Sequence, residues 1–162
     1  MSKENSANKS PYPEDVKHMK RILVDQTYCT GCRYCEIVCS LSHEGEVNYR
    51  KSRIRVFDDA LNGIDQPVVC DPKKCETMPC ISSCPVCAIK INEKLDYPTL
   101  DLETCTGCRT CVNVCPINAI FFDEDKSKAL KCDLCGGETE CVKRCTAHVY
   151  LPHITTPVLR YE

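Results

Sequence analysis

Apolar residues occur along this chain in short runs, separated by turns rich in cysteine, glycine and proline. Runs of this kind are typical of short β-strands. None approaches the roughly eighteen consecutive apolar residues of a membrane-spanning helix, so we expect no membrane contact. The expected strands are Ile22–Asp25, Arg53–Phe57, Val86–Ile91, Thr99–Leu102, Ile117–Phe122 and Lys128–Lys131.

The two ends of the chain differ from this pattern and from each other. Residues 1–19 are polar and contain prolines, which predicts a flexible arm. They lack the apolar core and cleavage site of a secretory signal, so we expect a cytoplasmic protein. The tail of residues 152–162 is more apolar, and either packs on its own domain or contacts a partner protein.

Cysteine is the residue that changes this picture most, because 17 of the 162 residues are cysteines. Sixteen of them fall into four runs of four. The runs are Cys29, Cys32, Cys35 and Cys39; Cys70, Cys75, Cys80 and Cys84; Cys105, Cys108, Cys111 and Cys115; and Cys132, Cys135, Cys141 and Cys145. Since one [4Fe–4S] cluster takes four thiolates, the count is that of four clusters.

Disulfides and zinc are the other uses of so many cysteines. Disulfides belong to oxidising compartments, which the expected cytoplasmic location disfavours. A zinc ribbon uses two well-separated Cys-x2-Cys pairs, whereas the first and third runs each place three cysteines at Cys-x2-Cys-x2-Cys. The segment from Cys105 to Pro116 matches the bacterial ferredoxin pattern in full. Iron–sulfur clusters are therefore favoured, and a zinc-binding scaffold protein is the remote alternative.

The spacing explains how such a run binds a cluster. Three cysteines at intervals of three lie on a short loop whose N–H groups point towards the cluster. We expect Gly31 and Gly107 to let the backbone approach it closely. The fourth cysteine follows a helical turn and points to a neighbouring cluster, and Pro85 or Pro116 then ends the turn. Each run should therefore serve two clusters.

The chain contains an internal repeat, since the segment Tyr28–Cys35 reappears in similar form as Thr104–Cys111. With these motifs the chain resembles the four-cluster, ferredoxin-type electron-transfer subunits found beside tungsten, molybdenum or nickel oxidoreductases, over about residues 20–151. The resemblance implies an α+β fold of two fused bacterial-ferredoxin-like modules, with short strands and short helices around four [4Fe–4S] clusters. The inner module covers about residues 66–122, and the outer module combines residues 20–58 with 123–151.

The resemblance also implies which cysteines share a cluster, because the first run of the family is paired with the fourth and the second with the third. Carried over, the iron ligands are Cys29, Cys32, Cys35 and Cys145 for cluster 1; Cys39, Cys132, Cys135 and Cys141 for cluster 2; Cys70, Cys75, Cys80 and Cys115 for cluster 3; and Cys84, Cys105, Cys108 and Cys111 for cluster 4.

Two cysteines depart from the family pattern. Cys70 precedes Cys75 by five positions, which is more than usual, so Cys70 is the ligand that the spacing supports least. Cys87 is unmatched, and we expect it to be a small buried residue beside a cluster rather than a ligand. The alternative is that Cys87 replaces Cys84 as the iron ligand, although the ligand would then no longer be the cysteine that directly precedes proline.

The function implied by the resemblance is non-catalytic electron transfer in anaerobic metabolism. The subunit would relay single electrons between a large tungsten- or molybdenum-pterin catalytic subunit and an FAD-containing, NAD-linked subunit or a ferredoxin. Small subunits of tungsten aldehyde oxidoreductases and class II benzoyl-CoA reductases are the most similar. The alternatives are a free polyferredoxin and the small subunit of a carbon monoxide dehydrogenase, formate dehydrogenase or hydrogenase system. The sequence leaves open whether copies of the chain associate with one another, and we expect no nucleic-acid partner.

Charge and the remaining chemistry add two expectations. Four clusters would take the formal net charge from −2 to about −10, so nearby cations are needed, although each cation is equally well explained as solvated surface charge. The candidates are Arg33, Lys73, Lys74, Arg109, Lys131, Lys143 and Arg144. The four histidines are expected on the surface without catalytic or ligand roles; they are His18, His43, His148 and His153. No phosphate loop, dinucleotide fingerprint or Ser–His–Asp grouping is present.

The chain has few large apolar side chains, with no tryptophan and three phenylalanines. A chain of this length would normally need a larger apolar core. We therefore expect the clusters to serve as the core and the protein without iron to be largely unfolded.

Overall fold

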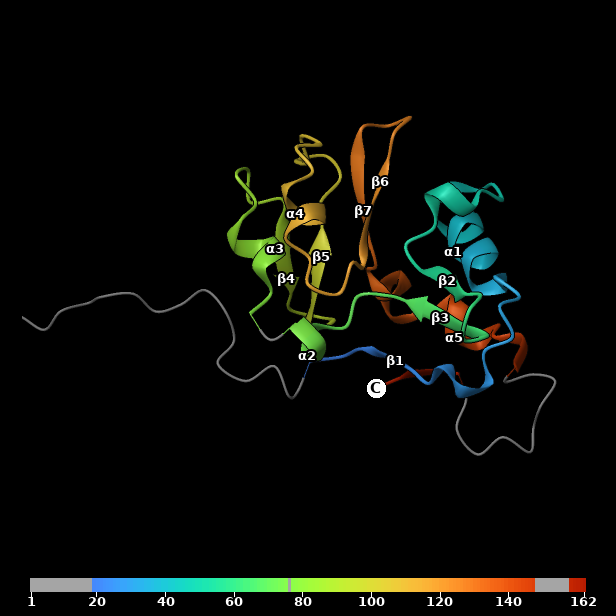
Figure 1. The fold of residues 1–162 in the computed structure, drawn as a ribbon. Helices are drawn as coiled ribbons and strands as arrows, with labels where there is room; N and C mark the ends of the chain where they lie inside the picture. Colours follow the sequence, from blue (N-terminus) through green and yellow to red (C-terminus); the bar gives the residue numbers. More distant parts are fainter. Residues whose placement is uncertain (1–18, 76, 148–157) are drawn as a thin grey trace, which may run out of the picture.

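Short helices and short antiparallel hairpins make up the described part of the chain, in agreement with the expected α+β class. The structure is a computed structural model that describes residues 19–75, 77–147 and 158–162 (Figure 1). The helices are α1 (Tyr34–Glu44), α2 (Pro72–Cys75), α3 (Pro79–Ser82), α4 (Thr110–Asn113) and α5 (Glu140–Lys143), with 3-10 turns η2 (Gln26–Tyr28), η3 (Tyr49–Lys51) and η4 (Leu134–Gly137). Among the described helices only α1 is longer than about one turn.

The strands pair as four two-stranded antiparallel sheets. The pairs are β1 (Ile22–Val24) with β8 (Leu159–Tyr161), β2 (Arg55–Asp59) with β3 (Ile64–Val68), β4 (Ile89–Asn92) with β5 (Tyr97–Leu100), and β6 (Ile120–Asp123) with β7 (Lys128–Lys131). The prediction for β7 is confirmed at both ends. β4 and β6 begin three residues later than predicted, because Cys87 and Asn118 have positive φ angles of 50° and 51° and form turns. β3, β8 and the length of α1 were not predicted.

The elements gather in two groups with one hairpin between them. Figure 1 shows α3, α4, β4 and β5 together on one side and α1, α5, β2 and β3 on the other, with the β6–β7 hairpin between the two groups. The buried residues form a larger cluster around Ile54, Tyr97 and Leu134, which includes residues of both groups, and a smaller one around Ile89 and Ile120. Nine buried cysteines belong to these two clusters, so the core is made largely around thiols.

Strand pairing also joins the two ends of the described chain. β1 pairs with β8, with Leu23 opposite Arg160, and Val158 and Leu159 are buried. The end of the tail therefore packs on its own chain. The predicted flexible arm, apart from the buried Met19, and tail residues 152–157 lie outside the described residues.

Among the described residues, no helix has the length and apolar character needed to cross a membrane.

Candidate metal centres

The structure brings the sixteen cysteines of the four runs together as four groups of thiols. The groups are site 1 (Cys29, Cys32, Cys35 and Cys145), site 2 (Cys39, Cys132, Cys135 and Cys141), site 3 (Cys70, Cys75, Cys80 and Cys115) and site 4 (Cys84, Cys105, Cys108 and Cys111). In every group, one thiol interacts electrostatically with the other three. These groups have the same members as the predicted ligand sets, and the ligand roles themselves stay predictions.

The third cysteine of each run is the thiol at the centre of its group. Burial raises the pKa of this thiol, and the negative charges of the other three raise it further, to about 12 for Cys80 and about 11 for Cys111. The pKa values of Cys35 and Cys141 are also raised well above the usual range by burial. Each group therefore needs a cation if its thiols are to be deprotonated together.

A left-handed residue begins the helical turn in every run. The residues are Arg33, Met78, Arg109 and Thr139, with φ angles of 55°, 43°, 61° and 44°. Each lies two positions before the third cysteine, and the fourth cysteine follows one helical turn later. This conformation costs about 1–2 kcal/mol for a residue with a Cβ atom, so it persists only where the surroundings hold it. Sequence analysis missed these positions because no glycine marks them.

Two glycines in the runs have left-handed backbone conformations and lie against neighbouring hairpins, and their expected close approach to a cluster stays a prediction. Gly31 and Gly107 have φ angles of 63° and 73°. A Cβ atom at Gly107 would lie 2.0 Å from the carbonyl oxygen of Ser127, in the turn between β6 and β7, and one at Gly31 would lie 2.5 Å from the Asp65 carboxylate. The backbone of Ser127 therefore leaves no room for a side chain at Gly107, whereas one at Gly31 would require the side chain of Asp65 to move.

Backbone N–H groups donate to the fourth cysteine of three runs, whereas the sequence analysis expected donors from the loop of the first three cysteines. The N–H of Ala88 lies 3.2 Å from the sulfur of Cys84, and that of Ala119 lies 3.3 Å from the sulfur of Cys115. The N–H of Arg53 donates to the sulfur of Cys39 at 3.3 Å. Such bonds stabilise the negative charge of a thiolate.

The unusual spacing before Cys75 is absorbed by the helical turn α2. Asp71 begins this turn, because its side chain accepts a hydrogen bond from the N–H of Lys73 at 3.0 Å and its carbonyl accepts one from Lys74. Winding the extra residues into a turn shortens the link, and Cys70 lies in site 3 with Cys75 and Cys80.

The expectation that Cys87 is buried is wrong, because its side chain is exposed. Its φ angle is +50°, and Asn118 occupies the same place after Cys115-Pro116 with a φ angle of +51°. Such a turn points the side chain away from the core, and the group around Cys111 contains Cys84 instead.

The four sites follow one another in a linear series. Electrostatic contacts join Cys35 to Cys141 between sites 1 and 2, and Cys132 to Cys70 between sites 2 and 3. Sites 3 and 4 adjoin because α3 and α4 each supply a cysteine to one site and are followed by a cysteine of the other.

The two ends of the series are the parts open to solvent. Cys32 of site 1 and Cys108 of site 4 are exposed, whereas every cysteine of sites 2 and 3 is buried or partly buried. Site 1 and site 4 each line a hollow with all four of their thiols. The two ends of the series are therefore the parts that an outside molecule can approach most easily.

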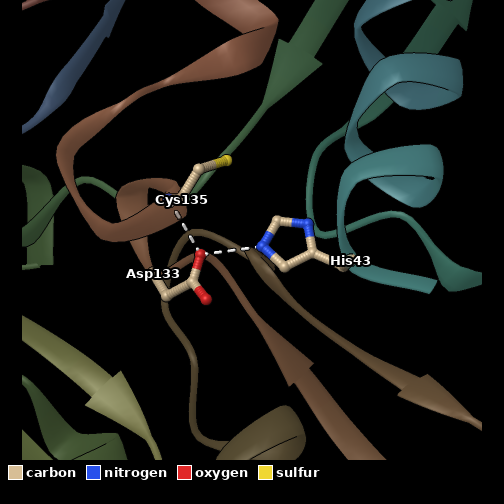
Figure 2. Close-up of side chains that lie close together, drawn as sticks. All are labelled: His43, Asp133 and Cys135. Carbon is tan, nitrogen blue, oxygen red and sulfur yellow. Dashed lines mark hydrogen bonds and ion pairs between the residues drawn. The ribbon is translucent and has the colours of Figure 1, made fainter. Parts of the chain in front are cut away.

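His43 connects site 2 to a hydrogen-bonded network, and Figure 2 shows its contact with Asp133 beside Cys135. Its Nδ1 lies 2.8 Å from the carbonyl oxygen of Cys39, and its Nε2 lies 3.0 Å from a carboxylate oxygen of Asp133, whose other oxygen accepts a 2.6 Å bond from Arg53. Because both ring nitrogens face acceptors, both carry protons. Burial lowers the pKa of His43, but the bonds to Asp133, Cys135 and Cys39 outweigh it and raise the pKa to about 12.

The expectation of a surface position for His43 is therefore wrong, since its side chain is only 11% exposed. The side chains of His43, Asp133 and Cys135 lie close enough to hold a metal ion by themselves. Because Cys135 also belongs to the group of thiols around Cys141, we interpret the histidine and the carboxylate as supports for site 2. The other three histidines lie outside the described residues.

Lys131 is the candidate cation whose placement differs most from a solvated surface charge. Its side chain is 1% exposed, and its Nζ lies 3.0 Å from the sulfur of Cys70 and 2.6 Å from the carbonyl oxygen of Pro98. Beside it, Tyr97 is fully buried and its hydroxyl donates to the carbonyl oxygen of Cys70 at 2.7 Å. Sequence analysis did not identify Tyr97, because its partner is 27 positions away.

The residues present fit [4Fe–4S] clusters. Each site offers four thiols, which is the donor set of one such cluster, and backbone N–H groups donate to several of them. A structural zinc site also accepts four thiols, but zinc does not account for the linear series of adjoining sites.

Comparison with known proteins supports the same chemistry. The family model described as "4Fe-4S binding domain" matches residues 98–121. The "Aliphatic sulfonate oxidoreductase, polyferredoxin-like subunit" of Pyrococcus furiosus is 39% identical over 132 residues, which cover 82% of this chain and 75% of the relative. The "Putative electron transport protein YsaA" of Escherichia coli is 34% identical over 136 residues, covering 76% of this chain and 83% of the relative.

Among solved structures, the one titled "Active site complex BamBC of Benzoyl Coenzyme A reductase as isolated" contains a chain 28% identical to this one, with a TM-score of 0.49. The match covers 89% of this chain and 76% of that chain. The sequence relatives confirm the resemblance stated from the cysteine runs. The chain belongs to the family of polyferredoxin-like iron–sulfur proteins that transfer electrons.

Proposed function

We propose that this protein is the electron-transfer subunit of an oxidoreductase complex and holds four [4Fe–4S] clusters in a linear series. The observation that carries the proposal is the gathering of sixteen thiols into four adjoining groups. Sites 1 to 4 hold clusters 1 to 4 with the ligands predicted above. Sites 3 and 4 form the inner ferredoxin-like module, and sites 1 and 2 form the outer one.

The clusters, when bound, supply one-electron redox chemistry, and the chain's own residues position and tune them. Thiolates hold the iron, and N–H groups such as those of Arg53, Ala88 and Ala119 stabilise negative charge on sulfur. Every cysteine of sites 2 and 3 is buried or partly buried, which limits the contact of the middle of the series with water. Electrons enter and leave at the exposed ends, near Cys32 and Cys108.

The ends of the series should therefore face different partners. The Pyrococcus furiosus relative is named as a subunit of an oxidoreductase, which supports a catalytic partner for this chain as well. From the family resemblance, we propose a large tungsten- or molybdenum-pterin subunit, such as an aldehyde oxidoreductase, at one end. An FAD-containing subunit or a ferredoxin occupies the other. Residues 1–19 and residues 152–157 of the tail are the segments proposed for partner contact, since the end of the tail pairs with β1.

Anaerobic purification from the native host through an affinity tag tests this proposal. We expect a large subunit to co-purify with tungsten or molybdenum, and about sixteen iron atoms per copy of this chain. Co-purifying nickel would instead indicate a carbon monoxide dehydrogenase or hydrogenase system. A chain with full iron and no partner would be a free polyferredoxin. A colourless zinc protein would refute electron transfer altogether.

A further inference from the structure

A buried ammonium group lies at the junction between the two proposed modules. Lys131 is the last residue of β7 and directly precedes Cys132 of site 2, while its Nζ donates to the sulfur of Cys70 in site 3. Its charge also interacts with the thiols of Cys80 and Cys132. One cation therefore faces the two sites through which electrons would pass between the modules.

The surroundings of Lys131 identify its counter-charge. No carboxylate of the described residues forms an ion pair with Lys131. An ammonium group buried without a counter-charge costs several kcal/mol, and the face of the Tyr97 ring, 4.8 Å away, compensates only part of this. The carbonyl oxygen of Pro98 supplies a dipole but no charge. The negative charge must therefore come from sulfur, above all from Cys70.

Neighbouring groups hold this pair in place. The hydroxyl of Tyr97 fixes the carbonyl of Cys70, and the ring of the same residue lies against the ammonium group. Lys131 is also fixed at its other end, because β7 pairs with β6 and places Lys131 opposite Ile120. The charge is thus held at a constant distance from site 3 and is shielded from solvent ions.

We propose that Lys131 is the internal counter-ion of the cluster at site 3, and that its fixed charge raises the reduction potential of this cluster. The inference rests on the proposed function. A reduced cluster carries one more negative charge than an oxidised one, so a nearby cation stabilises the reduced state. A higher potential at site 3 favours an electron residing at this site, in the middle of the series.

Substitution of Lys131 tests the proposal through cluster potentials measured by EPR during anaerobic redox titration. Lys131→Met keeps a long unbranched side chain without charge, and Lys131→Gln keeps a hydrogen-bond donor without charge. Lys90→Met, at an exposed position on β4, is the control. We expect one of the four potentials to be clearly lower than in the wild type in both Lys131 variants, and all four to be unchanged in the control. Unchanged potentials in Lys131 variants with full iron would overturn the proposal.

A second measurement needs no variant. Wild-type protein labelled with 15N at the lysine Nζ should show a weak nitrogen coupling to a reduced cluster in pulsed EPR, because the N–H donates directly to a sulfur. Among the described residues, Lys131 is the lysine whose Nζ contacts a thiol. Absence of this coupling in a protein with about sixteen iron atoms would refute the inference alone, whereas absence of the iron would refute the proposed function.

A Lys131 variant that loses one cluster also gives a definite answer. Loss of about four iron atoms relative to Lys90→Met, with the other clusters retained, supports a counter-ion at a single site. Loss that is spread evenly over all four clusters points to a general packing role and contradicts the proposal.

Discussion

Substitution of Gly107 by alanine should disturb site 4 far more than the loss of a single glycine elsewhere. Two costs add at this position. The φ angle of +73° costs an alanine about 1–2 kcal/mol relative to glycine. The new Cβ atom would also lie 2.0 Å from the carbonyl oxygen of Ser127, and overpacking of this kind costs about 1–3 kcal/mol. Because the obstacle is backbone, it cannot rotate away, and the total is about 2–5 kcal/mol.

Gly136→Ala is the matched control, since Gly136 also lies in a cysteine run. Its φ angle is +65°, but a Cβ atom there would meet nothing within 4 Å. It should therefore show only the conformational cost of about 1–2 kcal/mol. Gly31→Ala should lie between the two, because the obstacle is the side chain of Asp65, which can move.

The assay is the temperature at which the visible absorption of the protein is lost under argon, at one heating rate. With about 3 °C per kcal/mol for a chain of this size, the melting temperature should fall by about 3–6 °C in Gly136→Ala and by about 6–15 °C in Gly107→Ala. Gly107→Ala should also lose up to about four iron atoms, from site 4. Equal melting temperatures for these two variants would show that the contact with Ser127 has no influence, and the reasoning would be refuted.

Three further predictions concern the thiols and their supports. Tyr97→Phe removes the hydrogen bond to the carbonyl of Cys70 and should lower the free energy of unfolding by about 1–3 kcal/mol, seen as a lower melting temperature; an unchanged melt would contradict this role. Cys87→Ser should retain the iron of the wild type, whereas Cys84→Ser should lose a cluster, and equal iron contents would count against the assignment of site 4. Protein stripped of iron by a chelator should lose its cooperative melt in circular dichroism, because buried thiols and thin apolar clusters replace an ordinary core; a native-like melt would show that the chain folds without metal.

The repeated spacing of the cysteines predicted the local part of the architecture well. Each run forms a loop followed by a helical turn, and a turn of this kind is fixed by residues three or four positions apart. The hairpin from Ile120 to Lys131 follows the same logic, because β-strand alternation is also a short-range signal. The pairing of the first run with the fourth came from the family resemblance and not from spacing.

The remainder depends on contacts between distant positions. Lys131 meets Cys70 across 61 positions, and His43 meets Asp133 across 90, so neither burial could be read from local sequence. The left-handed residues were missed for another reason. Arg33 and Met78 adopt a conformation that the local sequence disfavours, and tertiary packing imposes it. Cys87 was misplaced because the turn that exposes it is set by backbone conformation rather than by polarity.

The two ends of the chain are joined by the β1–β8 pair and by site 1, and this affects the order in which the sites are completed during synthesis. The thiols of sites 3 and 4 all lie between residues 70 and 115, whereas site 1 joins Cys29 to Cys145. Chains leave the ribosome from the N-terminus onwards, at about 5–20 residues per second. The inner pair of sites is therefore complete while the last quarter of the chain is still being made, and the first cysteines to emerge are among the last to find all their partners. Until Cys145 has been synthesised, Cys29, Cys32 and Cys35 lack the fourth thiol of site 1. A chain truncated before Cys145 would never complete this site.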